Sequence, residues 1–319
     1  MTKTPAHQPQ VAADGTDSPL LIGSAPDSWG VWFADDPKQP PWQRFLDEVS
    51  EAGYRYVELG PYGYLPPNPG WLKDELAARD LTVSAGTVFT AFHRTSADER
   101  RATWEQVRRV AELTQAVGGE HIVVIPAMWR DDVTGEAVED EHLSAEQWHR
   151  LFEAHNELGT VLHEEYGLRQ QFHPHADAHV CDQQQIERFL DGTDPDLVSL
   201  CLDTGHAEYG GASSVDLIRR YPERIGYLHL KQVDPGVLDM VRRENLTWAA
   251  ANRARVMIEP PSGKPDLAEV IDELEQIGRG FYCIVEQDMY PLDSFDIPLP
   301  IATRTRQYLC GCGSRTRIR

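Results

Sequence analysis

The chain has 319 residues, 41% of them hydrophobic, which is enough to fill one large barrel core or two smaller cores. Its 30 Lys and Arg against 51 Asp and Glu give a formal net charge of −21, which argues against nucleic acid as a partner. No run approaches the roughly 18 consecutive apolar residues of a membrane span. The five cysteines do not suggest a disulfide framework, so we expect a cytoplasmic protein without a membrane partner.

Eight short apolar runs follow a polar stretch over residues 1–18, which we predict to be a disordered tail. Several runs are apolar nearly throughout, which is typical of parallel strands buried on both faces. The runs predicted as strands are residues 21–25, 56–60, 82–89, 121–126, 168–173, 198–203, 225–231 and 281–286.

Amphipathic stretches separate these runs. Apolar residues at helical spacing predict helices over residues 42–52, 97–117, 144–166 and 266–277. Strands that alternate with helices favour a single (β/α)8 TIM barrel over residues 19–309, followed by a tail over residues 310–319. A doubly wound open sheet is the competing architecture, but no Gly-x-Gly-x-x-Gly follows the first strand.

An insertion over residues 234–265, between the seventh and eighth strands, is too long for a bare loop. It contains a helix-like stretch over residues 237–255. In a barrel this insertion overhangs the carboxyl ends of the strands, where active sites are built. Glu259, within it, is therefore a candidate for substrate contact.

Four successive strands end in metal-capable side chains, namely His173, Asp203, His229 and Glu286. Each has an ordinary structural role when taken alone, but the strand ends of a closed barrel converge on one small volume. Mixed imidazole and carboxylate groups suit Mn²⁺, Co²⁺, Zn²⁺ or Mg²⁺, so the pattern predicts a divalent metal site. His175 shares a side of its strand with His173, because side chains alternate along a strand.

Aromatic and cationic side chains follow the first four strands. Aromatic faces stack on the C–H faces of sugars, so we expect substrate contacts from Trp29, Tyr62, Trp129 and Arg130. Loop anchoring by ordinary packing is the alternative for each. No glycine-rich phosphate loop accompanies Arg130, which favours an unphosphorylated substrate.

Several segments carry a family pattern: SAPDSWG (24–30), VELGPYGY (57–64), FHPHAD (172–177), LDTGH (202–206), YPERI (221–225) leading into LHLK (228–231), and VEQD (285–288). Together they resemble the xylose isomerase-like TIM barrel superfamily of sugar isomerases and epimerases, and most closely its inosose dehydratase-like branch. The resemblance covers about residues 21–309. It implies a divalent metal, usually Mn²⁺ or Co²⁺, held by a Glu-Asp-His-Glu set, and we expect Mn²⁺.

Asp203, His229 and Glu286 match the last three ligands of that set. The first ligand departs, because the fifth strand offers two glutamines where many members place Glu. His173 or His175 must then replace it, and we favour His173 as the ligand with His175 facing the substrate. The resemblance also implies that His206 contacts the substrate and that Lys231 orients a substrate oxygen or Glu286.

These assignments predict an enzyme of inositol or related carbohydrate catabolism that removes the proton α to the carbonyl of a keto-sugar or keto-cyclitol. His175 or Glu58 is the candidate base, and Glu286 and Lys231 complete the predicted catalytic set. Reprotonation gives epimerisation or isomerisation, whereas loss of a β-hydroxyl gives dehydration. The related barrels often form dimers or tetramers, so we also expect a homo-oligomer.

Three alternatives stay open. Cleavage of an oxidised glycoside by β-elimination uses the same first step. An abasic-site endonuclease with a zinc cluster belongs to the same superfamily, but the net charge of −21 argues against it. A barrel that has lost its chemistry is the third, because the Glu of the fifth strand is missing.

Overall fold

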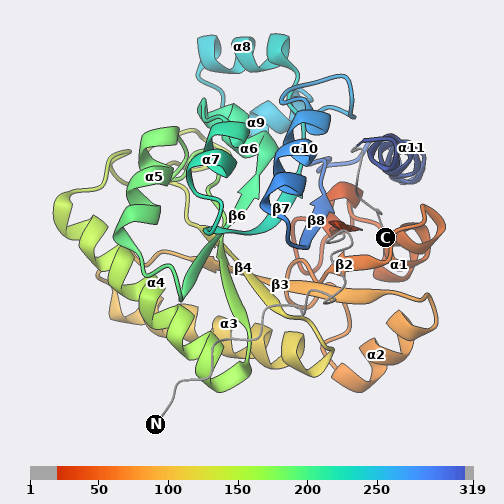
Figure 1. The fold of residues 1–319 in the computed structure, drawn as a ribbon, viewed down its shortest axis with the longest axis horizontal. Coiled ribbons are helices and arrows are strands. Elements are labelled where there is room, and N and C mark those ends of the chain that lie inside the picture. Colours follow the sequence, from red (N-terminus) through yellow and green to blue (C-terminus); the bar gives the residue numbers. More distant parts are fainter. Residues whose placement is uncertain (1–19, 313–319) are drawn as a thin grey trace.

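A computed structural model describes residues 20–312 of the chain. The tail predicted over residues 1–18 and the end of the tail predicted over residues 310–319 therefore lie outside the described residues. Eight parallel strands pair in chain order and close into a barrel (Figure 1). They are β1 (Leu20–Ser24), β2 (Tyr56–Glu58), β3 (Thr82–Thr90), β4 (His121–Pro126), β5 (Arg169–Phe172), β6 (Val198–Asp203), β7 (Ile225–Leu230) and β8 (Phe281–Val285).

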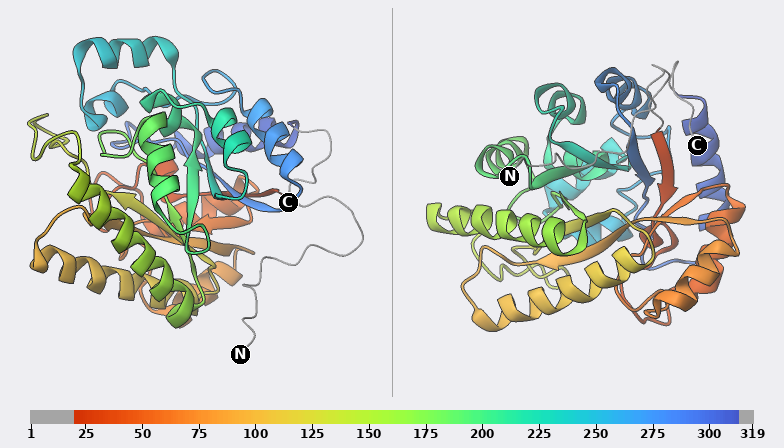
Figure 2. Two further views of the ribbon diagram at one scale, coloured as in Figure 1. Left: turned by 60° about the vertical axis from the view of Figure 1, so that its left-hand side comes forward. Right: turned by 60° about the horizontal axis from the view of Figure 1, so that its bottom comes forward.

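Closure comes from the pairing of β1 with β8, in which Leu20 lies opposite Phe281 and Ser24 opposite Val285. This pairing confirms the predicted barrel and excludes the open sheet. The helices surround the strands, as the right view of Figure 2 shows. They are η1 (Pro26–Trp29), α1 (Trp42–Glu51), α2 (Pro69–Ala77), α3 (Ala97–Ala116), α4 (Ala145–Tyr166), α5 (Gln183–Gly192), α6 (Thr204–Gly210), α7 (Ser214–Arg220), α8 (Pro235–Glu244), α9 (Trp248–Arg253), α10 (Leu267–Ile277) and α11 (Pro298–Cys310).

The four predicted helices form as α1, α3, α4 and α10. Helix α4 begins with a capping box, in which the Ser144 hydroxyl accepts from the Gln147 N–H and the Gln147 side chain accepts from the Ser144 N–H. It ends at Gly167, whose φ of 67° lies in the left-handed region that glycine adopts without strain.

The helix-like stretch over residues 237–255 is not one helix but two, α8 and α9. Asn245 adopts a left-handed conformation with φ 50° and ends α8, and the Thr247 hydroxyl caps α9 by accepting from the Ala250 N–H. Both helices lie between β7 and α10 in the chain. They form a hydrophobic cluster of their own, in which Trp248 and Leu238 are buried together with Ala176 from the segment after β5. This segment thus packs against a loop at the carboxyl end of the barrel.

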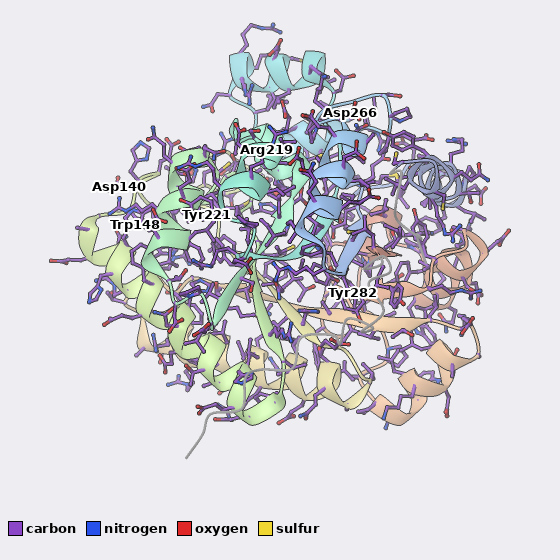
Figure 3. All side chains as sticks on the ribbon, in the orientation of Figure 1. Asp140, Trp148, Arg219, Tyr221, Asp266 and Tyr282 are labelled. Atoms are coloured by element: carbon purple, nitrogen blue, oxygen red, sulfur yellow. The ribbon has the colours of Figure 1, made fainter. Side chains whose placement is uncertain are left out.

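The barrel interior is layered because side chains alternate along each strand. One apolar layer is formed by Ala85, Val123, Cys201, Tyr227 and Ile284. Towards the amino end, the ring of Tyr282, labelled in Figure 3, lies against that of His121. The next inward positions along β6, β7 and β8, towards the carboxyl end, are polar. No helix among residues 20–312 is both long enough and apolar enough to span a membrane.

Candidate active site

A buried cluster of His173, Asp203, His229 and Glu286 lies at the carboxyl ends of β5 to β8. Each offers a ligand atom, and these atoms all lie within 4.8 Å of one another. Nε2 of His173 is 3.4 Å from Oδ2 of Asp203, and Nδ1 of His229 is 2.8 Å from Oε2 of Glu286. The structure therefore brings together the four residues that the sequence analysis selected as ligands.

The donor set fits a divalent cation. Oδ2 of Asp203 and Nδ1 of His229 are buried and make no hydrogen bond to any of the described residues, although charged groups lie close by. Buried polar atoms in this state are costly, and a shared cation would satisfy them. Two imidazoles with two carboxylates are a common ligand combination for Zn²⁺, Mn²⁺ or Co²⁺.

Glu58 supports the cluster from behind rather than facing into it. Its Oε1 lies 2.8 Å from Nε2 of His229, so Nδ1 of that ring faces Asp203 and Glu286. A carboxylate on the far nitrogen of a metal-binding imidazole fixes the ring and its tautomer. Burial lowers the pKa of His229, but Cys201, Glu286 and Glu58 together raise it well above its usual value. This placement favours a positioning role for Glu58 over the predicted role of base.

Lys231 is surrounded by carboxylates. Its Nζ lies 2.7 Å from Asp288 Oδ2, 3.0 Å from Glu286 Oε2, 3.2 Å from Asp203 Oδ2 and 3.9 Å from Asp27 Oδ2. Burial raises the pKa of Asp203, but the Lys231 ammonium and the surrounding histidines together outweigh it and hold that pKa well below its usual value. The sequence analysis did not select Asp27 and Asp288. Asp288 could have been found from its position two residues after Glu286, on the same side of the strand, and Asp27 from its place within the SAPDSWG segment.

His175 and His206 form a second pair beside the cluster, with ring centroids 4.1 Å apart. Nδ1 of His175 lies 2.8 Å from the carbonyl oxygen of Ala176 and must donate to it, which leaves Nε2 as the acceptor nitrogen. Nδ1 of His206 accepts from the Ala176 N–H, so its Nε2 carries the proton. Burial lowers the pKa of His175 to about 3 and that of His206 well below its usual value, so both rings are neutral at pH 7.

The ring of Trp248 in α9 covers this pair, with centroids 4.6 Å from His206 and 5.4 Å from His175. The sequence analysis did not select Trp248, although an aromatic residue in an insertion over the barrel mouth was a usable signal. The histidine pair therefore lies between the metal-ligand cluster and the inserted helices. His173 also contacts both rings, at 5.8 Å from His175 and 5.3 Å from His206.

Three of the predicted substrate contacts are engaged elsewhere. Trp29 is fully buried and its indole N–H donates to Glu48 of α1. Tyr62 lies beneath a guanidinium from α3. Both oxygens of Glu259 accept from the guanidinium of Arg304 in α11. These placements favour packing and ion-pair roles over substrate contact. The sequence of a short connecting segment does not show which way a side chain turns, so these contacts could not be predicted.

Arg130 joins two barrel loops to the inserted helices. Its Nη2 lies 2.7 Å from Oδ1 of Asp177, and its Nη1 donates to the side chain of Asn245. The other oxygen of Asp177 accepts from the backbone N–H of Trp248. The Arg130 guanidinium also covers the ring of Trp129 at 5.2 Å. Both Nη atoms of Arg130 are engaged and its Nε is buried without a hydrogen-bond partner among residues 20–312, so this placement favours a buried anchor over a substrate contact.

Comparison with known proteins gives a consistent picture. The model of the xylose isomerase-like TIM barrel family matches residues 46–307. The inosose dehydratase of Geobacillus kaustophilus is 28% identical over 308 residues, which cover 92% of this chain and 95% of that protein. The structure of an IolI protein with a bound zinc atom aligns with a TM-score of 0.71 at 16% identity, covering 92% of this chain and all of that chain. D-Allulose 3-epimerase from Methylomonas sp., in complex with D-allulose, aligns with a TM-score of 0.67 at 18% identity, covering 93% and 99%.

Proposed function

Because this chain belongs to the xylose isomerase-like TIM barrel family, we propose that it is a lyase that dehydrates a keto-cyclitol or keto-sugar. The relatives named inosose dehydratase, which match over about nine-tenths of the chain, support this class of substrate. The observation that carries the proposal is the cluster of His173, Asp203, His229 and Glu286 beside two neutral imidazoles. We place the catalytic unit at residues 19–309, and we retain the homo-oligomer as a prediction.

The four clustered residues would hold one divalent cation, for which Mn²⁺ is our first expectation and Co²⁺, Zn²⁺ and Mg²⁺ are the alternatives. When bound, such a cation polarises a substrate carbonyl and stabilises the negative charge that develops as the α-proton leaves. Lys231 keeps the carboxylates of Asp203 and Glu286 ionised and in place. Glu58 holds the ring of His229 in the orientation that binding requires.

His175 and His206 divide the proton transfers between them. Nε2 of His175 accepts the α-proton, because its Nδ1 proton is committed to the Ala176 carbonyl. The electron pair of the broken C–H bond forms the new C=C bond, and the bond between the β-carbon and its oxygen breaks. The departing oxygen takes the proton from Nε2 of His206 and leaves as water. Trp248 covers the pair and limits the access of bulk water to it.

The test is a panel of keto-inositols and keto-glucosides incubated in deuterated water with the metal-loaded protein. We expect deuterium at the α-carbon of recovered substrate and an unsaturated ketone, or its diketone tautomer, as the product, and both should be lost in His175→Gln. The matched control is His149→Gln, which changes an exposed histidine of α4. Exchange without elimination would point to epimerisation or isomerisation, and release of an aglycone would point to glycoside cleavage. A metal-loaded protein that neither exchanges the α-proton of any member of the panel nor forms an unsaturated product from it would refute the proposal.

A further inference from the structure

A second group of metal-capable side chains lies outside the site described above. His93, Glu139 and His179 follow β3, β4 and β5, respectively, and each belongs to the loop before the next helix. One ligand atom from each lies within 4.8 Å of the other two. Figure 3 labels Asp140, the neighbour of Glu139 in the chain, at the edge of the fold near the start of α4. The group shares no residue with the first cluster.

Both histidines of this group are almost completely buried, at 2% exposure for His93 and 3% for His179. Nδ1 of His179 lies 2.9 Å from the carbonyl oxygen of Glu141 and must donate to it. In the neutral ring Nε2 of His179 therefore carries a lone pair, and this nitrogen faces Oε1 of Glu139 at 3.5 Å. This buried nitrogen has no hydrogen-bond partner among residues 20–312.

Hydrogen bonds within the group account for the placement of His93 and Glu139 but not for that of His179. Nε2 of His93 lies 2.9 Å from Oε2 of Glu139, and the Arg94 guanidinium donates to Oε1 of the same carboxylate. Neither contact satisfies His179, whose lone pair points at an already negative oxygen. Two acceptors facing each other in a buried place are unfavourable unless a cation lies between them. The carbonyl that fixes His179 is also the usual outer partner of a metal-binding imidazole.

Two of the three side chains, His93 and Glu139, have the charge state that a metal ligand needs at neutral pH. Burial and the neighbouring His179 lower the pKa of His93, so its imidazole is neutral. Burial raises the pKa of Glu139, but the hydrogen bonds from Arg94 and His93 and the charge of Arg94 outweigh it and bring that pKa to about 2. Two imidazoles and one carboxylate are the ligand set of many zinc sites with one open position.

We propose that His93, Glu139 and His179 bind a second divalent cation, with Zn²⁺ as the best match to two imidazoles and a carboxylate. The cation takes the place of the proton on Nε2 of His93, which moves to Nδ1 of the same ring, and Arg94 holds the Glu139 carboxylate in position from outside. Three loops of the barrel mouth are thereby tied together at one point. The second site stands whether or not the barrel acts on keto-sugars, since the two clusters share no ligand.

The test measures zinc stoichiometry on the full chain after metal has been stripped with chelator. Protein is saturated with Zn²⁺, freed of excess by gel filtration and analysed for bound metal. We expect two equivalents in wild type and one in His179→Gln. His149→Gln, the exposed control, should keep two. The double variant Asp203→Asn, His229→Gln should keep one, which separates failure of the first site from failure of the second.

A second measurement covers the case in which His179→Gln does not fold. Crystals of zinc-loaded wild-type protein should show an anomalous peak at the zinc absorption edge between His93, Glu139 and His179. Absence of that peak overturns the proposal. Two other results also overturn it: one equivalent in wild type that stays one in a folded His179→Gln, and two equivalents that stay two in that variant.

Discussion

Replacing Glu58 with Gln removes the negative charge behind His229 while keeping the size of the side chain. In the native structure Oε1 of Glu58 accepts from Nε2 of His229 over 2.8 Å, and both side chains are buried. The carboxylate fixes the tautomer of the ring and strengthens Nδ1 as a metal ligand. Loss of such a partner typically weakens metal binding by about 10–100-fold, which corresponds to about 1.4–2.7 kcal/mol.

The assay is competition between stripped protein and a metal-binding dye, run beside steady-state kinetics at saturating metal. For Glu58→Gln we expect the dissociation constant of the metal to rise by about 10–100-fold, with most of kcat recovered at saturation. Glu51→Gln, at an exposed position at the end of α1, is the matched control and should leave both values unchanged. If Glu58 were the base, metal affinity would stay constant and kcat would collapse even at saturating metal. Unchanged metal affinity would refute our reasoning.

Three further predictions concern the scaffold of the site. Burial lowers the pKa of His155 to about 4 from about 6.5 in the unfolded chain, so its stabilising contribution is present above pH 6.5 and is lost towards pH 4. Urea titrations should show that wild type loses about 2 kcal/mol more than His155→Gln between pH 7 and pH 5, and equal losses would contradict this. Asp177→Asn leaves the buried guanidinium of Arg130 without its counter-charge, which should lower the free energy of unfolding by about 3–5 kcal/mol and speed proteolysis within α8 and α9. An unchanged rate of cleavage would contradict the role of Arg130 as an anchor of these helices. In Gly205→Ala the new Cβ would lie 2.7 Å from Cγ of Lys231, so we expect about 1–3 kcal/mol of destabilisation together with reduced activity. A variant with the melting temperature and turnover of wild type would show that Lys231 can move aside without loss of stability or activity.

The barrel and the first cluster follow from patterns that are local in the chain. Apolar runs such as residues 121–126 and 198–203 became strands with the predicted bounds, because a strand buried on both faces needs apolar side chains along its whole length. Asp203 and His229 could be selected because period two fixes which side chains point inward at a strand end. Local periodicity was therefore sufficient to find these strands and to place Asp203 and His229 inward, whereas the choice of His173 over His175 depended on the family resemblance.

The contacts that the sequence did not reveal join residues far apart in the chain. Glu58 meets His229 across 171 positions, and no local pattern distinguishes a carboxylate that orients a ligand from one that takes a proton. Trp29 ends the four-residue helix η1, which is too short for periodicity to show the direction of a side chain. The group formed by His93, Glu139 and His179 takes one residue from each of three loops, so the distances between them along the chain match no metal-binding motif.

The four ligands of the first cluster come from β5, β6, β7 and β8 or the residues directly after them, all within the C-terminal half of the chain. The loops after β3 and β4 supply none of these four, yet they form part of the same barrel mouth. Changes in those two loops that spare His93, Arg130 and Glu139 can therefore reshape the entrance without displacing a ligand of either cluster. Natural or laboratory evolution of new substrate preference should accordingly concentrate its changes there, while the second half of the gene stays conservative.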